Sequence, residues 1–113
     1  MTIEGNLAVF GTISQSSDNR LKKFENSLDV DFEALKSVRK SYFRFNKTPE
    51  VKDFGVSAQE LATIYPEIVK KDMRGYLGVD YSKLSVVALA AIDKLHERIK
   101  VLEDTILKLA ENK

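Results

Sequence analysis

The last third of the chain carries an apolar repeat that limits the folds open to it more than any other feature. Residues 82–112 predict one helix, with Ser82 as a candidate N-cap. At 1.5 Å per residue this helix is about 45 Å long. Its apolar residues are spaced alternately by three and four, at the a and d positions of a heptad: Ile92, Leu95, Ile99, Leu102, Ile106 and Leu109.

A stripe of this length cannot be covered by the remaining residues, whose elements are short. We therefore interpret the helix as a coiled coil between copies of the chain; the alternative is a helix packed along its own domain. Arg98 at a g position and Glu103 at the next e position are placed for an interchain ion pair in a parallel arrangement. Because Ile at a with Leu at d favours two strands, the heptads alone indicate a dimer. His96, at an e position, is interpreted as a solvated side chain.

The first half of the chain mixes strand and helix signals. Residues 2–14 alternate loosely and predict short strands with a turn at Gly5, which need a neighbouring sheet or other copies to bury them. Asp31 is a candidate N-cap for a helix that reaches about Arg39. The aromatic stretch 41–45 then predicts a strand. After the loop "NKTPEVKD", the stretch "DFGV" predicts the second strand, which runs back along the first.

A second helix and a second hairpin follow. Ser57 and Glu60 have the spacing of a capping box, in which each side chain bonds the backbone amide of the other. This short helix must end before Pro66. The residues beyond it predict a hairpin that turns between Asp72 and Gly75. Together these signals indicate an α+β protein, a small mixed body with hairpins and short helices.

Charge and composition exclude several classes of function. A formal net charge of +1 offers no basic surface for nucleic acid or anionic membranes. The chain has no cysteine and one histidine, so we expect no metal centre and no cofactor. No apolar run reaches the length of about 18 residues that a membrane helix needs, so we expect a soluble protein. The aromatic and basic stretch at 42–45 is interpreted as core packing and not as a base-stacking strand: Tyr42, Phe43, Arg44 and Phe45.

The stretch "QSSDNRLKK" at 15–23 places hydroxyls and an acid directly before a cluster of cations. The simplest interpretation is a polar loop, capped by Asp18, that opens into a helix. The alternative is a cleavage site, in which Ser17 is activated by a base that takes its proton. Lys22 can be that base if a turn at Asp18-Asn19 brings the two together, and if burial or nearby cations favour the neutral amine. From spacing alone, the polar loop is the better interpretation.

Three blocks of the chain, in the same order, resemble the intramolecular chaperone domain of phage tail spikes, tail fibres and neck appendages, the S74 peptidase family. The first, "SDNRLKK" at 17–23, is similar to the S-D-x-R-x-K signature that opens this domain. "FGVSAQELATIYPEIV" at 54–69 is similar to its A-Q-E block, which ends in P-E. "YLGVDYSKLSVVALAAIDKLHERIKVLE" at 76–103 is similar to its V-D-Y-S block, which runs into a coiled coil. The chain departs from the family at "KFENSL", where Asn-Ile is common.

The resemblance implies a self-cleaving serine endopeptidase that acts once on its own chain. It places the nucleophile on Ser17 and its lysine partner on Lys22. The cut it implies is the bond Ser17-Asp18, with Ser16-Ser17 as the alternative. It also implies a homotrimer, against the dimer that the heptads indicate, because a three-chain stem upstream overrides a mild preference at a and d positions.

The resemblance further implies a division of the chain into three parts. Residues 1–16 are expected to end a trimeric β-stem, the folding client that belongs to the same polypeptide. Residues 17–81 are expected to form the α+β chaperone body, and residues 82–113 the coiled-coil helix. The parent is expected to be a phage structural protein, assembled in the host cytoplasm and carried in the virion after the chaperone part is released.

Two other functions remain open at this point. The first is a trimerisation and folding module that does not cleave. The second is an adaptor whose coiled coil recruits another protein; it would form a stable oligomer without cleavage and would tolerate the loss of residues 1–16.

Overall fold

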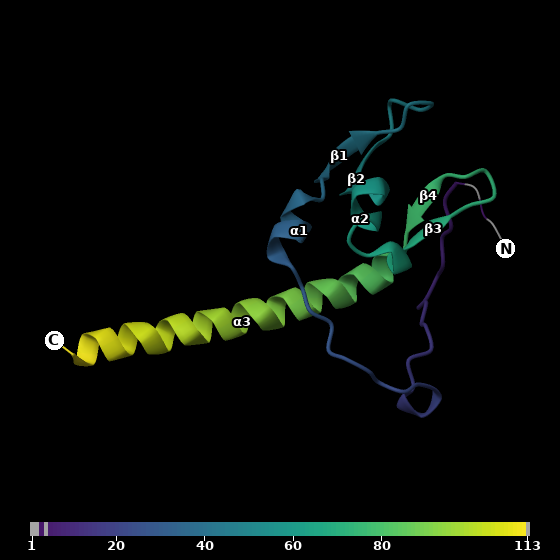
Figure 1. Cartoon of the computed structure of the whole chain (residues 1–113). Helices are drawn as coiled ribbons and strands as arrows, with labels where there is room; N and C mark the ends of the chain where they lie inside the picture. Colours follow the sequence, from purple (N-terminus) through teal and green to yellow (C-terminus); the bar gives the residue numbers. More distant parts are fainter. Residues whose placement is uncertain (1–2, 4, 113) are drawn as a thin grey trace.

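A small mixed body and one long helix make up the described part of the chain (Figure 1). The computed structural model describes residues 3 and 5–112, so residues 1, 2 and 4 of the expected stem and residue 113 of the expected helix lie outside the described residues. The elements are, in order, η1 (Asn19–Leu21), α1 (Phe32–Ser37), β1 (Lys40–Arg44), β2 (Lys52–Val56), α2 (Ala58–Ala62), η2 (Pro66–Ile68), β3 (Val69–Lys71), β4 (Leu77–Val79) and α3 (Tyr81–Glu111).

Two antiparallel hairpins supply the strands of the body. β1 pairs with β2 so that Lys40 lies opposite Val56 and Arg44 opposite Lys52, and β3 pairs with β4 in the same sense. Each sheet has two strands within the described residues. Because an isolated two-stranded hairpin is marginal in water, both must be held by the helices around them. The mixed class with small antiparallel sheets and a long C-terminal helix is confirmed.

The start of α1 follows the expected capping pattern. Asp31 has extended backbone angles, and its Oδ1 accepts hydrogen bonds from the amides of Glu33 at 3.0 Å and Ala34 at 3.2 Å. Two of the orphan amides of the first turn are thereby satisfied. The short sequence signal was sufficient here because cap and helix are adjacent in the chain.

The predicted capping box at α2 is half formed. Ser57 Oγ accepts from the amide of Glu60 at 3.3 Å, as expected. The reciprocal bond from the Ser57 amide to the Glu60 side chain is not formed, so this part of the prediction is wrong. That amide donates to the Arg39 carbonyl at 3.2 Å. Glu60 Oε1 instead accepts from the Arg39 amide at 2.7 Å. Since Ser57 directly follows β2, its amide extends the β1–β2 ladder and is no longer free for a local cap.

The core of the body is small and centres on α2. Leu61 and Val30 are each 1% exposed, and the segment before α1 therefore reaches the centre of the fold. From α3, among the described residues, Val87 alone is buried. The body thus buries α3 only near its start, although Lys94 and Arg98 further along still contact the body. The buried set is Val30, Val38, Leu61, Tyr65, Ile68 and Val87.

α3 begins two residues earlier than its predicted cap suggested. Asp80, not Ser82, is the N-cap, and its Oδ1 accepts from the Lys83 amide at 3.3 Å. Asp80 is held in an extended conformation because its own amide donates to the Ile68 carbonyl at 2.8 Å. A residue fixed in this way is outside the helix and free to cap it.

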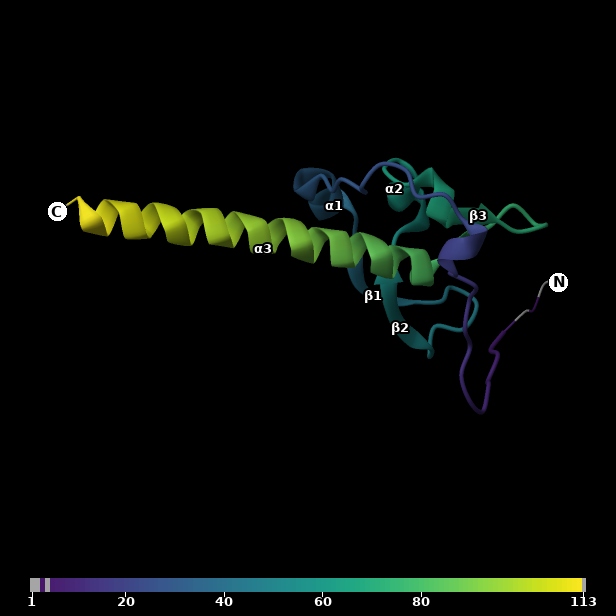
Figure 2. The same cartoon turned by 90° about the horizontal axis from the view of Figure 1, so that it is seen from below.

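The C-terminal half of α3 projects beyond the body in both views (Figures 1 and 2). The radius of gyration is 19.4 Å, against about 13 Å for a compact domain of this length. The longest extent of the chain is 64 Å. The predicted long helix is therefore confirmed as an element, and its residues 99–112 are all exposed in the single chain.

The described residues before η1 form an extended trace with no strand. Gly5 and Gly11 have positive φ angles of 86° and 134°, so the trace bends where the predicted turn lies and again further on. Phe10 is fully exposed. Strands of a stem need partners, so the β-stem expected at 1–16 stays a prediction about the assembled protein.

Candidate functional site

A short 3₁₀ turn brings the two expected reactive residues together. Between Ser17 and Lys22, η1 reverses the chain, and Lys22 Nζ donates to Ser17 Oγ at 2.6 Å. Asp18 caps this turn: its Oδ1 accepts from the Arg20 amide at 2.8 Å. The turn at Asp18-Asn19 that the contact requires is therefore present (Figure 1, dark blue).

The acid next to the serine is neutralised by its own partner. Arg20 binds Asp18 through two side-chain nitrogens, with the shortest contact at 2.7 Å. The hydrogen bond from Arg20 holds the pKa of Asp18 below its usual range. Asp18 therefore pairs with Arg20, while the Lys22 amine donates to Ser17.

The surroundings of the pair are open to solvent in the single chain. Ser17 and Lys22 are both exposed, and the Lys22 amine lies 5.2 Å from the centre of the Phe24 ring. Leu21 is 78% and Phe24 70% exposed, so two large apolar side chains flank the lysine without cover. The single chain therefore leaves the Lys22 amine unburied.

Gln15 is a site residue that the sequence reasoning missed. The hydroxyl of Ser82, in the first turn of α3, lies 2.6 Å from Asp80 Oδ1, to which it donates, and 2.9 Å from the side-chain amide of Gln15. The chain two residues before Ser17 is thus attached to the start of the long helix. The nearest signal in the sequence was Ser82 itself, which we had interpreted as a cap and which instead serves this tertiary contact.

The predicted coiled-coil residues lie on the exposed side of α3. They are 47% to 64% exposed, and the stripe is unpartnered in the single chain: Ile92, Leu95, Ile99, Leu102, Ile106 and Leu109. The Arg98 guanidinium lies 5.0 Å from the Phe32 ring centre, so this residue contacts α1 as well. His96 and Glu103 are exposed. The coiled coil and the ion pair between Arg98 and Glu103 of different chains stay predictions.

Two negative findings apply to the described residues. Within residues 3 and 5–112, no group of three or more His, Cys, Asp or Glu side chains is arranged to hold a metal ion. In the same part of the chain, no helix combines the length and the apolar character needed to cross a bilayer.

Comparison with known protein families gives a match that begins at Ser17. Residues 17–70 match the family Peptidase_S74, described as chaperone of endosialidase. The match runs from Ser17 through η2 into β3, and so contains the Ser17–Lys22 pair, whereas α3 lies outside it. No curated protein matches the chain. The description of the family supports an intramolecular chaperone role. Over residues 17–70, the chain is therefore similar to the Peptidase_S74 family, the chaperone of endosialidase, as the three sequence blocks predicted.

Proposed function

We propose that this chain is an intramolecular chaperone that trimerises, registers the folding of an upstream β-stranded client, and then releases itself by cutting its own chain beside Ser17. The observation that carries the proposal is the 2.6 Å hydrogen bond between Lys22 Nζ and Ser17 Oγ, at the residue where the family match begins. The client is the β-stem of the same polypeptide, and the parent is a phage tail or appendage protein assembled in the host cytoplasm.

The assembly step uses the exposed stripe of α3. Three chains that associate through this helix hold their upstream segments at a high effective concentration. Strand pairing between distant segments is slow, because the entropy of closing long loops is lost before the contacts form. Tethering three stem ends therefore accelerates the step that limits folding. The body at 17–81 then holds the stem ends in register.

The chemical step begins once assembly covers the Ser17–Lys22 pair. Burial favours the neutral Lys22 amine, which takes the proton of Ser17 Oγ as the oxygen attacks a peptide carbonyl carbon. A backbone amide stabilises the oxyanion. The lysine then gives the proton to the departing amine, leaving an ester on Ser17 that water hydrolyses. Cleavage leaves the stem kinetically trapped, because its chaperone is gone.

Two peptide bonds flank Ser17. The size of the ring that Ser17 Oγ would close in attacking each carbonyl determines whether the cut can occur within one chain. We favour Ser17-Asp18. Attack by Ser17 Oγ on the carbonyl of its own residue would close a strained four-membered ring, so this cut uses the hydroxyl of a neighbouring chain in the trimer. The alternative, Ser16-Ser17, proceeds within one chain through a five-membered ring.

Denaturing intact mass spectrometry tests the proposal. The purified chain is compared with Ser17→Ala and Lys22→Ala, and with the neighbouring substitutions Ser16→Ala and Lys23→Ala as matched controls. We expect two fragments meeting at Ser17 from the parent and both controls, and one intact mass from the other two variants. The fragment masses also tell which bond is cut. An uncut parent after long incubation as a trimer, or a cut Ser17→Ala chain, contradicts self-cleavage.

A trimerisation module that does not cleave is the second candidate. It is favoured by the exposure of Ser17 and Lys22 in the single chain. A coiled-coil adaptor is its close relative. Both give one intact mass in the experiment above, and the adaptor alone keeps its function when residues 1–16 are removed.

A further inference from the structure

The segment that bears Ser17 and Lys22 is attached to α3 at both of its ends. We call residues 15–30 the strap. Its first residue bonds Ser82 in the first turn of α3, and its last two residues bond Lys94, three turns further on. Among the described residues, no other hydrogen bond joins residues 15–28 to the rest of the chain. The strap is thus a loop whose two ends are both hydrogen-bonded to α3.

The first attachment is a short polar triad. Ser82 Oγ lies 2.9 Å from Gln15 Oε1 and 2.6 Å from Asp80 Oδ1. A hydroxyl has one hydrogen and accepts further bonds, and turning the Gln15 amide by 180° presents its NH₂ to the same oxygen. Ser82 then donates to the N-cap carboxylate and accepts from Gln15. This orientation of the amide gives both Asp80 and Gln15 a hydrogen bond, whereas in the other orientation two acceptors share one hydroxyl hydrogen.

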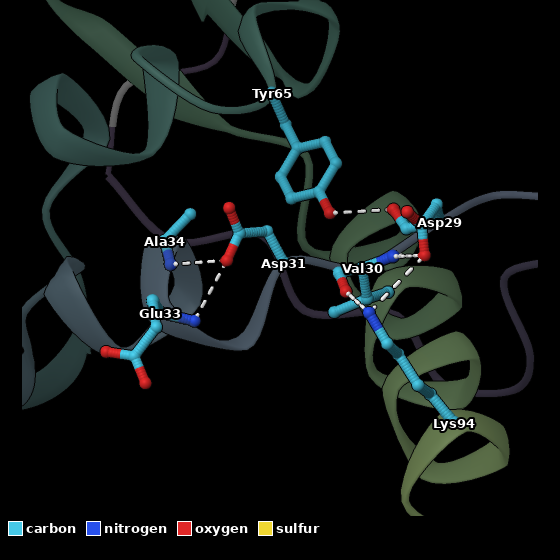
Figure 3. Close-up of polar contacts among 7 residues, drawn as sticks. All are labelled: Asp29, Val30, Asp31, Glu33, Ala34, Tyr65 and Lys94. Atoms are coloured by element: carbon cyan, nitrogen blue, oxygen red, sulfur yellow. Dashed lines mark hydrogen bonds and ion pairs between the residues drawn. The ribbon is translucent and has the colours of Figure 1, made fainter. Parts of the chain in front are cut away.

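The second attachment is a lysine clamp (Figure 3). Lys94 Nζ donates to the Val30 carbonyl and lies 3.5 Å from Asp29 Oδ1. Tyr65 donates to the Asp29 carbonyl at 3.5 Å from the opposite side. Val30 is 1% exposed, so this end of the strap is buried in the core while the remainder is exposed.

The distances show why the first attachment matters more for Ser17. Ser17 lies two residues from Gln15, a chain length of about 7 Å, but thirteen residues from Val30. The clamp at Lys94 alone would leave the serine free to move over a large volume. The bond between Gln15 and Ser82 restricts it to the neighbourhood of the first turn of α3.

We propose that Gln15 and Ser82 are positioning residues for the self-cleavage, and that through them α3 sets the place of Ser17. The inference rests on the proposed function. It adds a physical connection between the helix that assembles the chains and the bond that is cut, so that a displacement of α3 displaces Ser17 with it. Ser82 touches neither Ser17 nor Lys22, and acts through the strap.

The first experiment measures the rate of self-cleavage after dilution from denaturant. Ser82→Ala is compared with Ser85→Ala, a matched serine one turn further along whose hydroxyl bonds the Ser82 carbonyl. We expect a loss of about five-fold for Ser82→Ala, since a neutral hydrogen bond contributes on the order of 1 kcal/mol. Ser85→Ala should cut at the parent rate, and Ser82→Thr, which keeps the hydroxyl, should restore it. Gln15→Ala added to Ser82→Ala should cause no further loss, because the two act as a unit.

The second experiment does not depend on self-cleavage. In a Ser17→Ala background, trypsin digests the strap after Arg20, Lys22 and Lys23, and the initial rates are compared for Ser82→Ala and Ser85→Ala. We expect about five-fold faster digestion in Ser82→Ala alone, with an unchanged trimer mass.

The two experiments separate the two proposals. Equal digestion of the Ser82→Ala and Ser85→Ala chains overturns the positioning role, whether or not the parent cuts itself. If Ser82→Ala opens the strap but the parent never cuts, the attachment is real and the self-cleavage is wrong. If the parent cuts and all Ser82 variants match it, self-cleavage stands and the positioning role does not.

Discussion

Leu102 and Leu107 form a matched pair of leucines on α3 that differ in heptad position. In the single chain they are 60% and 61% exposed, so truncating either should cost below about 0.5 kcal/mol there. Leu102 is a d residue of the proposed coiled coil, whereas Leu107, at b, faces away from the stripe. We therefore expect Leu102→Ala to weaken the oligomer and Leu107→Ala to leave it intact.

The magnitude follows from the number of copies that change together. Truncating a buried leucine costs about 2–5 kcal/mol, as lost transfer free energy and a cavity. A homotrimer changes three leucines at one layer, so the lower limit is about 6 kcal/mol per trimer. This corresponds to a fall of roughly 10⁴-fold in the association constant. An effect of this size cannot come from a residue that remains on the surface.

Sedimentation equilibrium over a wide range of protein concentrations measures the change, with helix melting followed by circular dichroism as a second readout. The parent and Leu107→Ala should give the mass of three chains at concentrations where Leu102→Ala is largely monomeric. Equal association constants for the two variants would refute the coiled coil at this stripe. A parent mass of two chains would refute the trimer and restore the dimer that the heptads indicate.

Two further predictions concern the start of α3. A Cβ at Gly55 would lie 2.5 Å from the Tyr81 hydroxyl, so Gly55→Ala should destabilise the body. Tyr81→Phe, which loses the bond from the Val56 amide, should cost about 1 kcal/mol. Because the clash is with the hydroxyl, the double variant Gly55→Ala, Tyr81→Phe should lose less free energy of unfolding in urea than the sum of the two single variants. Additive losses would contradict this contact. The pKa of Asp80 is lowered from 3.8, chiefly by the hydrogen bond from Ser82. Its carboxylate therefore stabilises the fold above that pH, and the contribution is lost as pH falls through the lower folded value. Asp80→Asn should flatten this part of an acid titration of helicity, and identical profiles would show that the cap does not titrate as expected.

The contact between Ser17 and Lys22 could be predicted from the sequence because its geometry is local. Ser17 and Lys22 are five residues apart, and Asp18 and Asn19 are residues that favour the intervening turn. The structure forms this turn and the contact. The attachments of the same segment to α3 were not predictable, since Gln15 and Ser82 are 67 residues apart and no periodicity connects them.

Neighbouring residues are enough to specify three features: the cap of α1 at Asp31, the end of α2 before Pro66, and the apolar stripe of α3. These depend on backbone preferences and periodicity, which act within a few residues. The partner that each polar side chain takes depends instead on the folded arrangement of distant segments. Glu60 accepts from the Arg39 amide because the Ser57 amide is paired with the Arg39 carbonyl. Ser82 is free to bond the strap because Asp80 caps the helix. In an isolated peptide, each of these polar groups could bond several partners about equally well. The fold selects one partner because it brings only certain atoms within hydrogen-bond distance.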